Sequence, residues 1–213
     1  MPSITVLKSI ILLVISFLAG LGYFYIQSEQ SKAIRKKQLE ATSSILINIV
    51  IYIWLGKVIA NLPKFIDDPL AILAYPSNST AFYIASILGL INIMINVRKK
   101  KVLLNTYIIA FIPVFIGASL IFEFVNYINS GTINNLTYFI LLVVLVSLQL
   151  LMYKKTSIIK LNLIIVLIWA FVKLLYSIIF SYTTIFNYMI HPLYFIIIIL
   201  ITIYYMKMKK GVE

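Results

Sequence analysis

The sequence contains no cysteine and only one histidine, His191. The lack of cysteine excludes disulfides, thiol nucleophiles and thiolate metal sites. A single histidine excludes a site with several imidazole ligands. Glycine loops that cradle phosphates are also missing, and the adjacent pair Asp67-Asp68 suits a helix start better than acid–base catalysis. We therefore expect no metal and no cofactor, and these residue types assign no catalytic residue.

Charge is also scarce, since 11% of the 213 residues are charged while 62% are hydrophobic. Soluble domains carry about 25% charged residues, and a chain of this size has too little interior to bury so many apolar side chains. A water-soluble fold and a disordered chain are both excluded. The net charge of +12, from 18 basic and 6 acidic residues, then calls for an explanation within a membrane protein.

The apolar residues form continuous runs rather than alternating patterns, which indicates membrane helices. A spanning helix needs about 20 apolar residues, and we predict an all-α polytopic membrane protein with seven transmembrane helices in a single domain, residues 1–213. The first run is too long for a cleaved signal peptide, so we expect it to remain as a span. The seven runs are Ile4–Ile26, Ile45–Ala60, Ala81–Val97, Leu103–Phe124, Leu136–Met152, Leu161–Phe180 and Leu193–Met206.

The basic residues predict the orientation of these spans. In a seven-span chain, 14 of the 18 basic residues lie on one side of the membrane. The positive-inside rule then places the N-terminus outside and the C-terminus in the cytoplasm, and it explains the charge without nucleic acid as a partner. These residues are Lys32, Arg35, Lys36, Lys37, Arg98, Lys99, Lys100, Lys101, Lys154, Lys155, Lys160, Lys207, Lys209 and Lys210.

Three outer loops follow from this topology. In the first, Asp67-Asp68-Pro69 is typical of a helix start, and the apolar segment Leu70–Tyr75 is expected to form a short helix on the outer interface. The second loop is expected at residues 126–135 and the third at residues 181–192.

Four ionisable residues fall within the predicted spans: Lys8, Lys57, Glu123 and Lys173. Such groups are costly in a membrane and are functional candidates by default. Lys8 lies near a span end and can extend its ammonium group to the interface. The other three lie in the outer half of the membrane, where they either line one cavity that opens outward or form a buried ion pair that holds helices together.

Several short segments occur in the order that is found in a known enzyme family. They are Gly56-Lys57 at the end of the second span, Asp68-Pro69-Leu70-Ala71-Ile72-Leu73 in the first outer loop, Pro113 and Gly117 in the fourth span, Asn126-Tyr127-Ile128-Asn129 after it, and Leu167-Ile168-Trp169 followed by Val172-Lys173 in the sixth. With them, the chain resembles the prolipoprotein diacylglyceryl transferases. These are bacterial seven-span enzymes that transfer a diacylglyceryl group from phosphatidylglycerol to the lipobox cysteine of a preprolipoprotein.

The resemblance implies a binding site for a phospholipid headgroup. Lys57 and Lys173 stand where the family has arginines, so they are the candidate headgroup-binding residues. Glu123 is a candidate acid–base group or ion-pair partner, and Asn126 and Asn129 are secondary candidates. The family's His-Gly-Gly motif is replaced by Ile84-Ala85-Ser86, and lysine lacks the planar fork with which arginine grips a phosphate.

These substitutions favour a divergent, non-catalytic member of the family in the bacterial plasma membrane. It would bind an anionic phospholipid, similar to phosphatidylglycerol, or a lipidated or hydrophobic peptide from the outer leaflet. Two alternatives stay open. One is an active phosphatidylglycerol–prolipoprotein diacylglyceryl transferase with lysines in place of arginines. The other is a small permease, although few polar residues are present to line a hydrophilic path.

Overall fold

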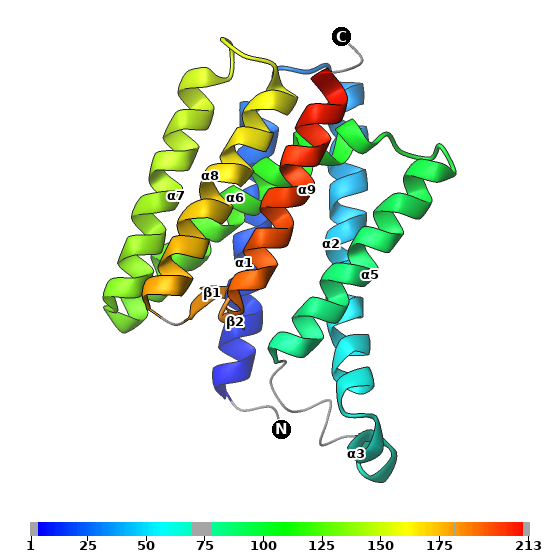
Figure 1. Cartoon of the computed structure of the whole chain (residues 1–213), viewed down its shortest axis with the longest axis vertical. Helices are drawn as coiled ribbons and strands as arrows, with labels where there is room; N and C mark the ends of the chain where they lie inside the picture. The colour runs from blue at the N-terminus through cyan, green and yellow to red at the C-terminus, as the bar shows by residue number, and fades with distance from the viewer. Residues whose placement is uncertain (1–3, 70–77, 181, 211–213) are drawn as a thin grey trace. The chain divides into compact units, whose positions relative to one another are not determined.

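The computed structural model describes residues 4–69, 78–180 and 182–210, and these residues are almost entirely helical (Figure 1). In chain order the elements are α1 (Ile4–Gln27), α2 (Lys32–Ala60), α3 (Leu62–Asp67), α5 (Ser79–Arg98), α6 (Leu104–Ser130), α7 (Ile133–Met152), α8 (Ile158–Ile179), β1 (Thr183–Ile185), β2 (Tyr188–Ile190) and α9 (Pro192–Lys210).

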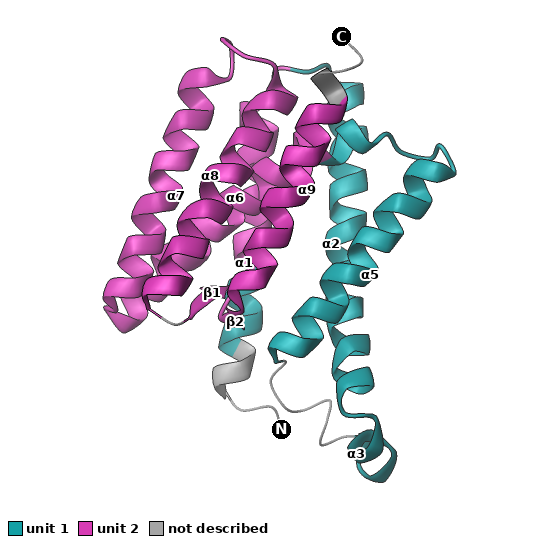
Figure 2. Ribbon diagram, viewed as in Figure 1, with its two compact units in different colours: residues 1–14, 30–107 teal, residues 15–29, 108–213 magenta. Residues whose placement is uncertain are grey.

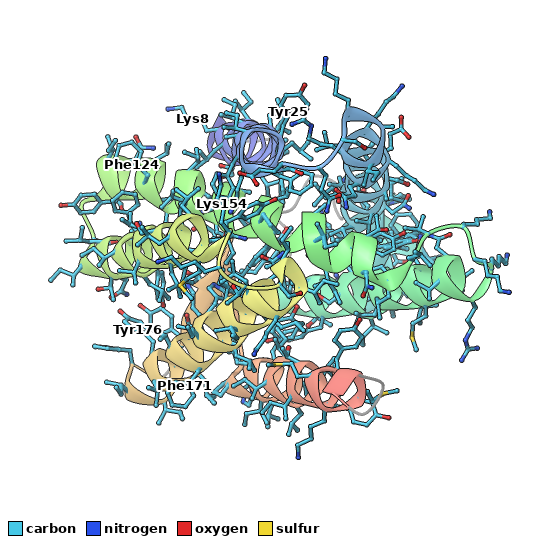
Figure 3. The ribbon with its side chains drawn as sticks, turned by 90° about the horizontal axis from the view of Figure 1, so that it is seen from above. Lys8, Tyr25, Phe124, Lys154, Phe171 and Tyr176 are labelled. Carbon is cyan, nitrogen blue, oxygen red and sulfur yellow. The ribbon has the colours of Figure 1, made fainter. Side chains whose placement is uncertain are left out.

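Six of the described helices (α1, α2, α5, α6, α7 and α8) are long and apolar enough to cross a membrane. The apolar part of α9, Pro192–Met208, is shorter. Large apolar side chains also lie on the outside of the protein, where Phe171 is 54% and Phe124 is 42% exposed (Figure 3). The fold is therefore that of an all-α membrane protein, as the composition predicts.

The chain divides into two compact units (Figure 2). Unit 1 contains residues 1–14 and 30–107, with α2, α3 and α5. Unit 2 contains residues 15–29 and 108–213, with most of α1 and α6 and all of α7, α8, the two strands and α9. The prediction of a single domain is not tested by this division and stays a prediction.

In unit 1, α2 packs against α5. The contact is close at Gly56, where a Cβ atom would lie 2.7 Å from the carbonyl oxygen of Ala81. Farther along the pair, Asn92 Nδ2 donates a hydrogen bond of 2.5 Å to the Tyr52 hydroxyl. Small residues that let backbones approach, and polar side chains that bond across helices, are the usual means of helix association in membranes.

In unit 2, α1 crosses α6 where both helices carry glycine. A Cβ atom on Gly20 would lie 2.9 Å from the Ala118 nitrogen, and one on Gly117 would lie 3.0 Å from Tyr23 Cδ1. The two helices can therefore touch only because these side chains are missing. On the other side of unit 2, α8 packs between α7 and α9 (Figure 1).

Several helices extend beyond the predicted spans, and α2 and α6 do so by the most residues. The second span was expected to begin at Ile45, but α2 begins at Lys32, because the basic segment before the apolar run also has good helix formers. The loop expected at residues 126–135 is wrong in its extent. The helix α6 continues to Ser130, Gly131 turns the chain with φ 61°, and α7 begins at Ile133.

The predicted helix start at Asp67-Asp68-Pro69 overlaps the end of α3. That helix ends at Asp67, Asp68 is extended with φ −143° and ψ 87°, and Pro69 is again helical. The remainder of the expected interfacial helix, Leu70–Tyr75, lies outside the described residues.

Candidate functional site

A β-hairpin follows the C-terminal end of α8, in the segment that was expected to be an outer loop. Its strands are antiparallel, with Thr183 opposite Ile190 and Ile185 opposite Tyr188. The two turn residues, Phe186 and Asn187, have φ of 49° and 67°. Positive φ at both turn residues is typical of a type I′ turn, whose twist matches that of the flanking strands. The β-branched residues threonine and isoleucine favour the strands themselves.

The tip of the hairpin reaches into the helix bundle of unit 2. The Phe186 ring lies 5.1 Å from the Phe17 ring, 5.7 Å from the Phe115 ring and 5.1 Å from the Phe122 ring, measured between centroids. Phe17 is ten residues from the end of α1, which is about 15 Å along the helix. The hairpin thus brings non-helical backbone to the depth of the helix interior, which membrane proteins tolerate only where protein or a water-filled cavity surrounds it.

Lys173 of α8 is buried, with 3% of its surface exposed, and holds this hairpin. Its Nζ atom donates a hydrogen bond of 2.8 Å to the carbonyl oxygen of Thr184. The same atom lies 3.1 Å from the centroid of the Tyr138 ring, in the geometry of a cation–π contact. A buried ammonium group thus has two partners in place of water.

A second set of contacts fixes the ring on which Lys173 rests. The hydroxyl groups of Tyr138 and Thr183 are 2.8 Å apart and share a hydrogen bond. The Tyr138 ring meets the Tyr176 ring at 4.9 Å, and the Tyr176 hydroxyl donates to Asn134 Oδ1 at the start of α7. Helices α7 and α8 and the strand β1 are therefore joined around the Lys173 ammonium group.

Glu123 of α6 is also buried, with 5% of its surface exposed. Its negative charge lies close enough to the positive charge of Lys173 for the two to attract each other. Among the described residues, however, no salt bridge within 4.0 Å joins them. The structure thus brings together two of the ionisable residues that the sequence singled out, without closing them into a contact pair.

One turn beyond Lys173 on α8 lies Ser177, with 1% of its surface exposed. Its Oγ atom is buried and has no hydrogen-bond partner in the described part of the chain. A buried hydroxyl without a partner is costly, so the Ser177 hydroxyl is a candidate to bond a further polar group.

The secondary candidates are near the turn of the hairpin. Asn126 Nδ2 donates a hydrogen bond of 3.4 Å to Asn187 Oδ1 at the turn. Asn129 is exposed in the last turn of α6. Asn126 therefore contacts the hairpin, whereas the side chain of Asn129 makes no hydrogen bond within the described residues.

Lys57 belongs to unit 1, whereas Glu123 and Lys173 belong to unit 2. It lies in the last turn of α2, and its side chain is 8% exposed. Its carbonyl oxygen accepts a hydrogen bond of 2.9 Å from Asn61 Nδ2. The neighbouring Gly56 is the point of close contact with α5, so the small residue before this lysine has a packing role.

A further polar network, which the sequence analysis missed, lies in unit 2. The Tyr23 hydroxyl donates to Gln149 Oε1 at 3.0 Å, and Gln149 Nε2 donates to Asn162 Oδ1 at 2.7 Å. Asn162 and Gln149 are fully buried, with 0% and 1% exposed. Both stand alone as amides within apolar runs, which is the signal that could have identified them.

Asn162 completes this network beside the proline inside α6. Pro113 has no N–H, so the carbonyl of Ile109, four residues earlier in α6, loses its usual donor. Asn162 Nδ2 donates to this oxygen at 3.3 Å and to the Ile108 oxygen at 2.9 Å. A side chain from α8 thereby supplies the hydrogen bond that the carbonyl of Ile109 loses to the proline.

The described residues contain no group of three or more His, Cys, Asp or Glu side chains that could hold a metal ion. The chain matches no protein-family model, and neither a curated protein nor a solved structure is significantly similar to it.

Proposed function

We propose that this chain is a seven-span protein of the bacterial plasma membrane that binds the headgroup of an anionic phospholipid from the outer leaflet, without catalysing a reaction on it. The N-terminus would lie outside and the C-terminus in the cytoplasm. The observation that carries the proposal is Lys173, a buried ammonium group in an apolar helix with a carboxylate, Glu123, in electrostatic range.

The count of seven spans is supported by α9. The apolar part of this helix, Pro192–Met208, is about 26 Å long at 1.5 Å per residue and reaches the lower limit of about 17 residues for a spanning helix. The hydrocarbon core of a bilayer is about 30 Å thick, so α9 together with the six longer helices would give seven crossings. The alternation of the basic clusters supports the orientation.

The chemistry of the site suits a headgroup that has both an acceptor and a donor. Lys173 would bind a phosphate oxygen as a point charge, and the buried Ser177 hydroxyl would supply a second hydrogen bond. Glu123 would repel a bare phosphate but would accept hydrogen bonds from hydroxyl groups of the headgroup. Phosphatidylglycerol offers this combination, because its glycerol hydroxyls lie next to its phosphate.

Lipid binding by the purified chain tests this proposal. In nanodiscs or detergent, we expect phosphatidylglycerol to bind at least tenfold more tightly than phosphatidylcholine, and Lys173→Met to abolish this preference. Lys8→Met is the matched control, because Lys8 is also a lysine of an apolar helix but is exposed. Native mass spectrometry can count the bound lipids.

Two outcomes would contradict the proposal. One is equal binding of both lipids by the unchanged chain. The other is an unchanged preference in a folded Lys173→Met variant. If a lipidated peptide binds preferentially in the same preparation, the peptide rather than the phospholipid is the ligand. Because Lys173→Met also removes a hairpin contact, Glu123→Gln serves as a second variant that keeps a hydrogen-bond acceptor.

A further inference from the structure

The hairpin of residues 183–190 depends on its surroundings for its structure. Each strand has only three residues, and an isolated two-stranded hairpin is marginally stable at best. Its contacts with the bundle include Lys173 at Thr184, Tyr138 at Thr183, Asn126 at Asn187, and three phenylalanine rings around Phe186.

The hydrogen bond from Lys173 meets the outer edge of the hairpin. In antiparallel pairs, residues alternate between those that bond to the partner strand and those whose backbone points away from it. Ile185 and Tyr188 flank the turn, so the next pair, Thr184 and Met189, directs its backbone groups outward. The Thr184 carbonyl therefore needs a partner outside the hairpin, and the Lys173 ammonium group is that partner.

The same ammonium group is required by the proposed ligand. Two of its three N–H directions are taken up, by the Thr184 oxygen at 2.8 Å and the Tyr138 ring at 3.1 Å. A phosphate oxygen is the stronger acceptor because it is charged, and it would take the place of the Thr184 oxygen. The unpartnered Ser177 hydroxyl, one turn away, is a second group that the hairpin leaves unsatisfied.

The turn itself also favours release. Phe186 has φ of 49°, a left-handed conformation that costs energy in a residue with a large side chain. In the observed position this cost is offset by the ring contacts with Phe17, Phe115 and Phe122.

We propose that the hairpin of residues 183–190 is a plug that occupies the headgroup site in the ligand-free protein and leaves it when a phosphate-bearing headgroup binds Lys173. This inference rests on the proposed function, since it assigns the regulation of the same site. The headgroup and the Thr184 carbonyl would compete for the N–H of Lys173 that now points to the Thr184 oxygen.

Crosslinking the hairpin to α6 tests the plug. The chain has no cysteine of its own, so a double variant, Asn126→Cys with Asn187→Cys, carries the only two thiols. The two asparagine side chains are 3.4 Å apart, and a bifunctional methanethiosulfonate with a short spacer can join the thiols. We expect the crosslinked protein to bind phosphatidylglycerol at least tenfold more weakly than the same protein after reduction with dithiothreitol.

The possible results separate the two proposals. Equal binding in the crosslinked and the reduced protein overturns the plug and leaves lipid binding at Lys173 intact. Binding in neither state, when the unchanged chain also fails to bind, overturns the proposed function and the plug with it. Loss of binding in the crosslinked state alone supports the plug.

Thiol labelling gives a measurement that does not depend on the crosslink. Phosphatidylglycerol is expected to raise the labelling rate of Phe186→Cys severalfold over phosphatidylcholine, because the turn leaves its aromatic surroundings. Met189→Cys is the matched control on the same hairpin, since Met189 is already 63% exposed. A rate at Phe186→Cys that is unchanged with the lipid bound would overturn the plug.

Discussion

Single polar residues in this protein have roles that follow from what lies opposite them. Asn162 is an amide within an apolar helix, and in isolation it would only destabilise a membrane span. Its position opposite Pro113 makes it the donor for a carbonyl that the proline leaves without a partner. Lys173 has the same relation to the hairpin, because it supplies a donor to an outward-facing carbonyl.

Replacing Asn162 with leucine is expected to destabilise unit 2. The change removes two hydrogen bonds to α6 and one to Gln149, and leaving buried polar groups unsatisfied costs about 1–3 kcal/mol. Thermal unfolding in detergent measures the loss. Asn129→Leu is the control, because Asn129 is exposed, and a similar shift for both variants would contradict the role of Asn162.

The ion pair at the ends of α1 and α7 predicts a small effect at alkaline pH. Lys154 Nζ lies 2.9 Å from Glu29 Oε1, and this hydrogen bond raises the pKa of Lys154. A raised pKa in the folded state adds stability below the ordinary lysine pKa of about 10.4, and this stability is lost as pH rises through the raised value. Both side chains are exposed, so the contribution is small.

Comparing the melting temperature of the unchanged chain and of Lys154→Met at neutral and at strongly alkaline pH measures this contribution. We expect a small difference at neutral pH that disappears above the pKa of Lys154. If the difference in melting temperature grows as the pH rises, the ion pair between Lys154 and Glu29 is not its source.

At the scale of elements, most helices were predictable and their ends were not. The run Ile4–Ile26 agrees with α1 within one residue, because apolar length alone defines this helix. Hydropathy does not detect the first turns of α2, because they are helical but basic rather than apolar. The hairpin was not predicted because residues 181–192 lack an Asn-Gly or Asp-Gly pair, which is the usual sequence signal for a hairpin turn.

Glycine positions on one helix give a matched pair of tests for the contact of α1 with α6. Gly20→Val is expected to destabilise unit 2 by about 1–3 kcal/mol, the usual cost of overpacking, because its Cβ would collide with the backbone at Ala118 and Val114. Gly22→Val is the control, since a Cβ at Gly22 meets no atom within 4 Å. Thermal unfolding of both variants measures the difference, and equal effects would exclude a close crossing.

At the scale of the whole molecule, the proposed topology is open to a direct test. A fluorescent protein fused after the C-terminus is expected to fluoresce, which requires a cytoplasmic location. Alkaline phosphatase inserted at Gly131, between α6 and α7, is expected to be active, which requires the outer side. A six-span arrangement without α9 would place the C-terminus outside, so a dark C-terminal fusion with normal expression would exclude seven spans.

The sequence by itself determined that this protein is a helical membrane protein, because apolar content and uninterrupted runs leave the backbone no other way to satisfy its hydrogen bonds in lipid. It also identified Glu123 and Lys173, because charge in an apolar run is conspicuous wherever the helix packs. Only the tertiary structure decided that these two lie near each other and that Lys173 holds the Thr184 carbonyl. The physical reason is that a partner on another element depends on how helices cross and where the hairpin turns, and neither is encoded in the hydropathy of a single segment.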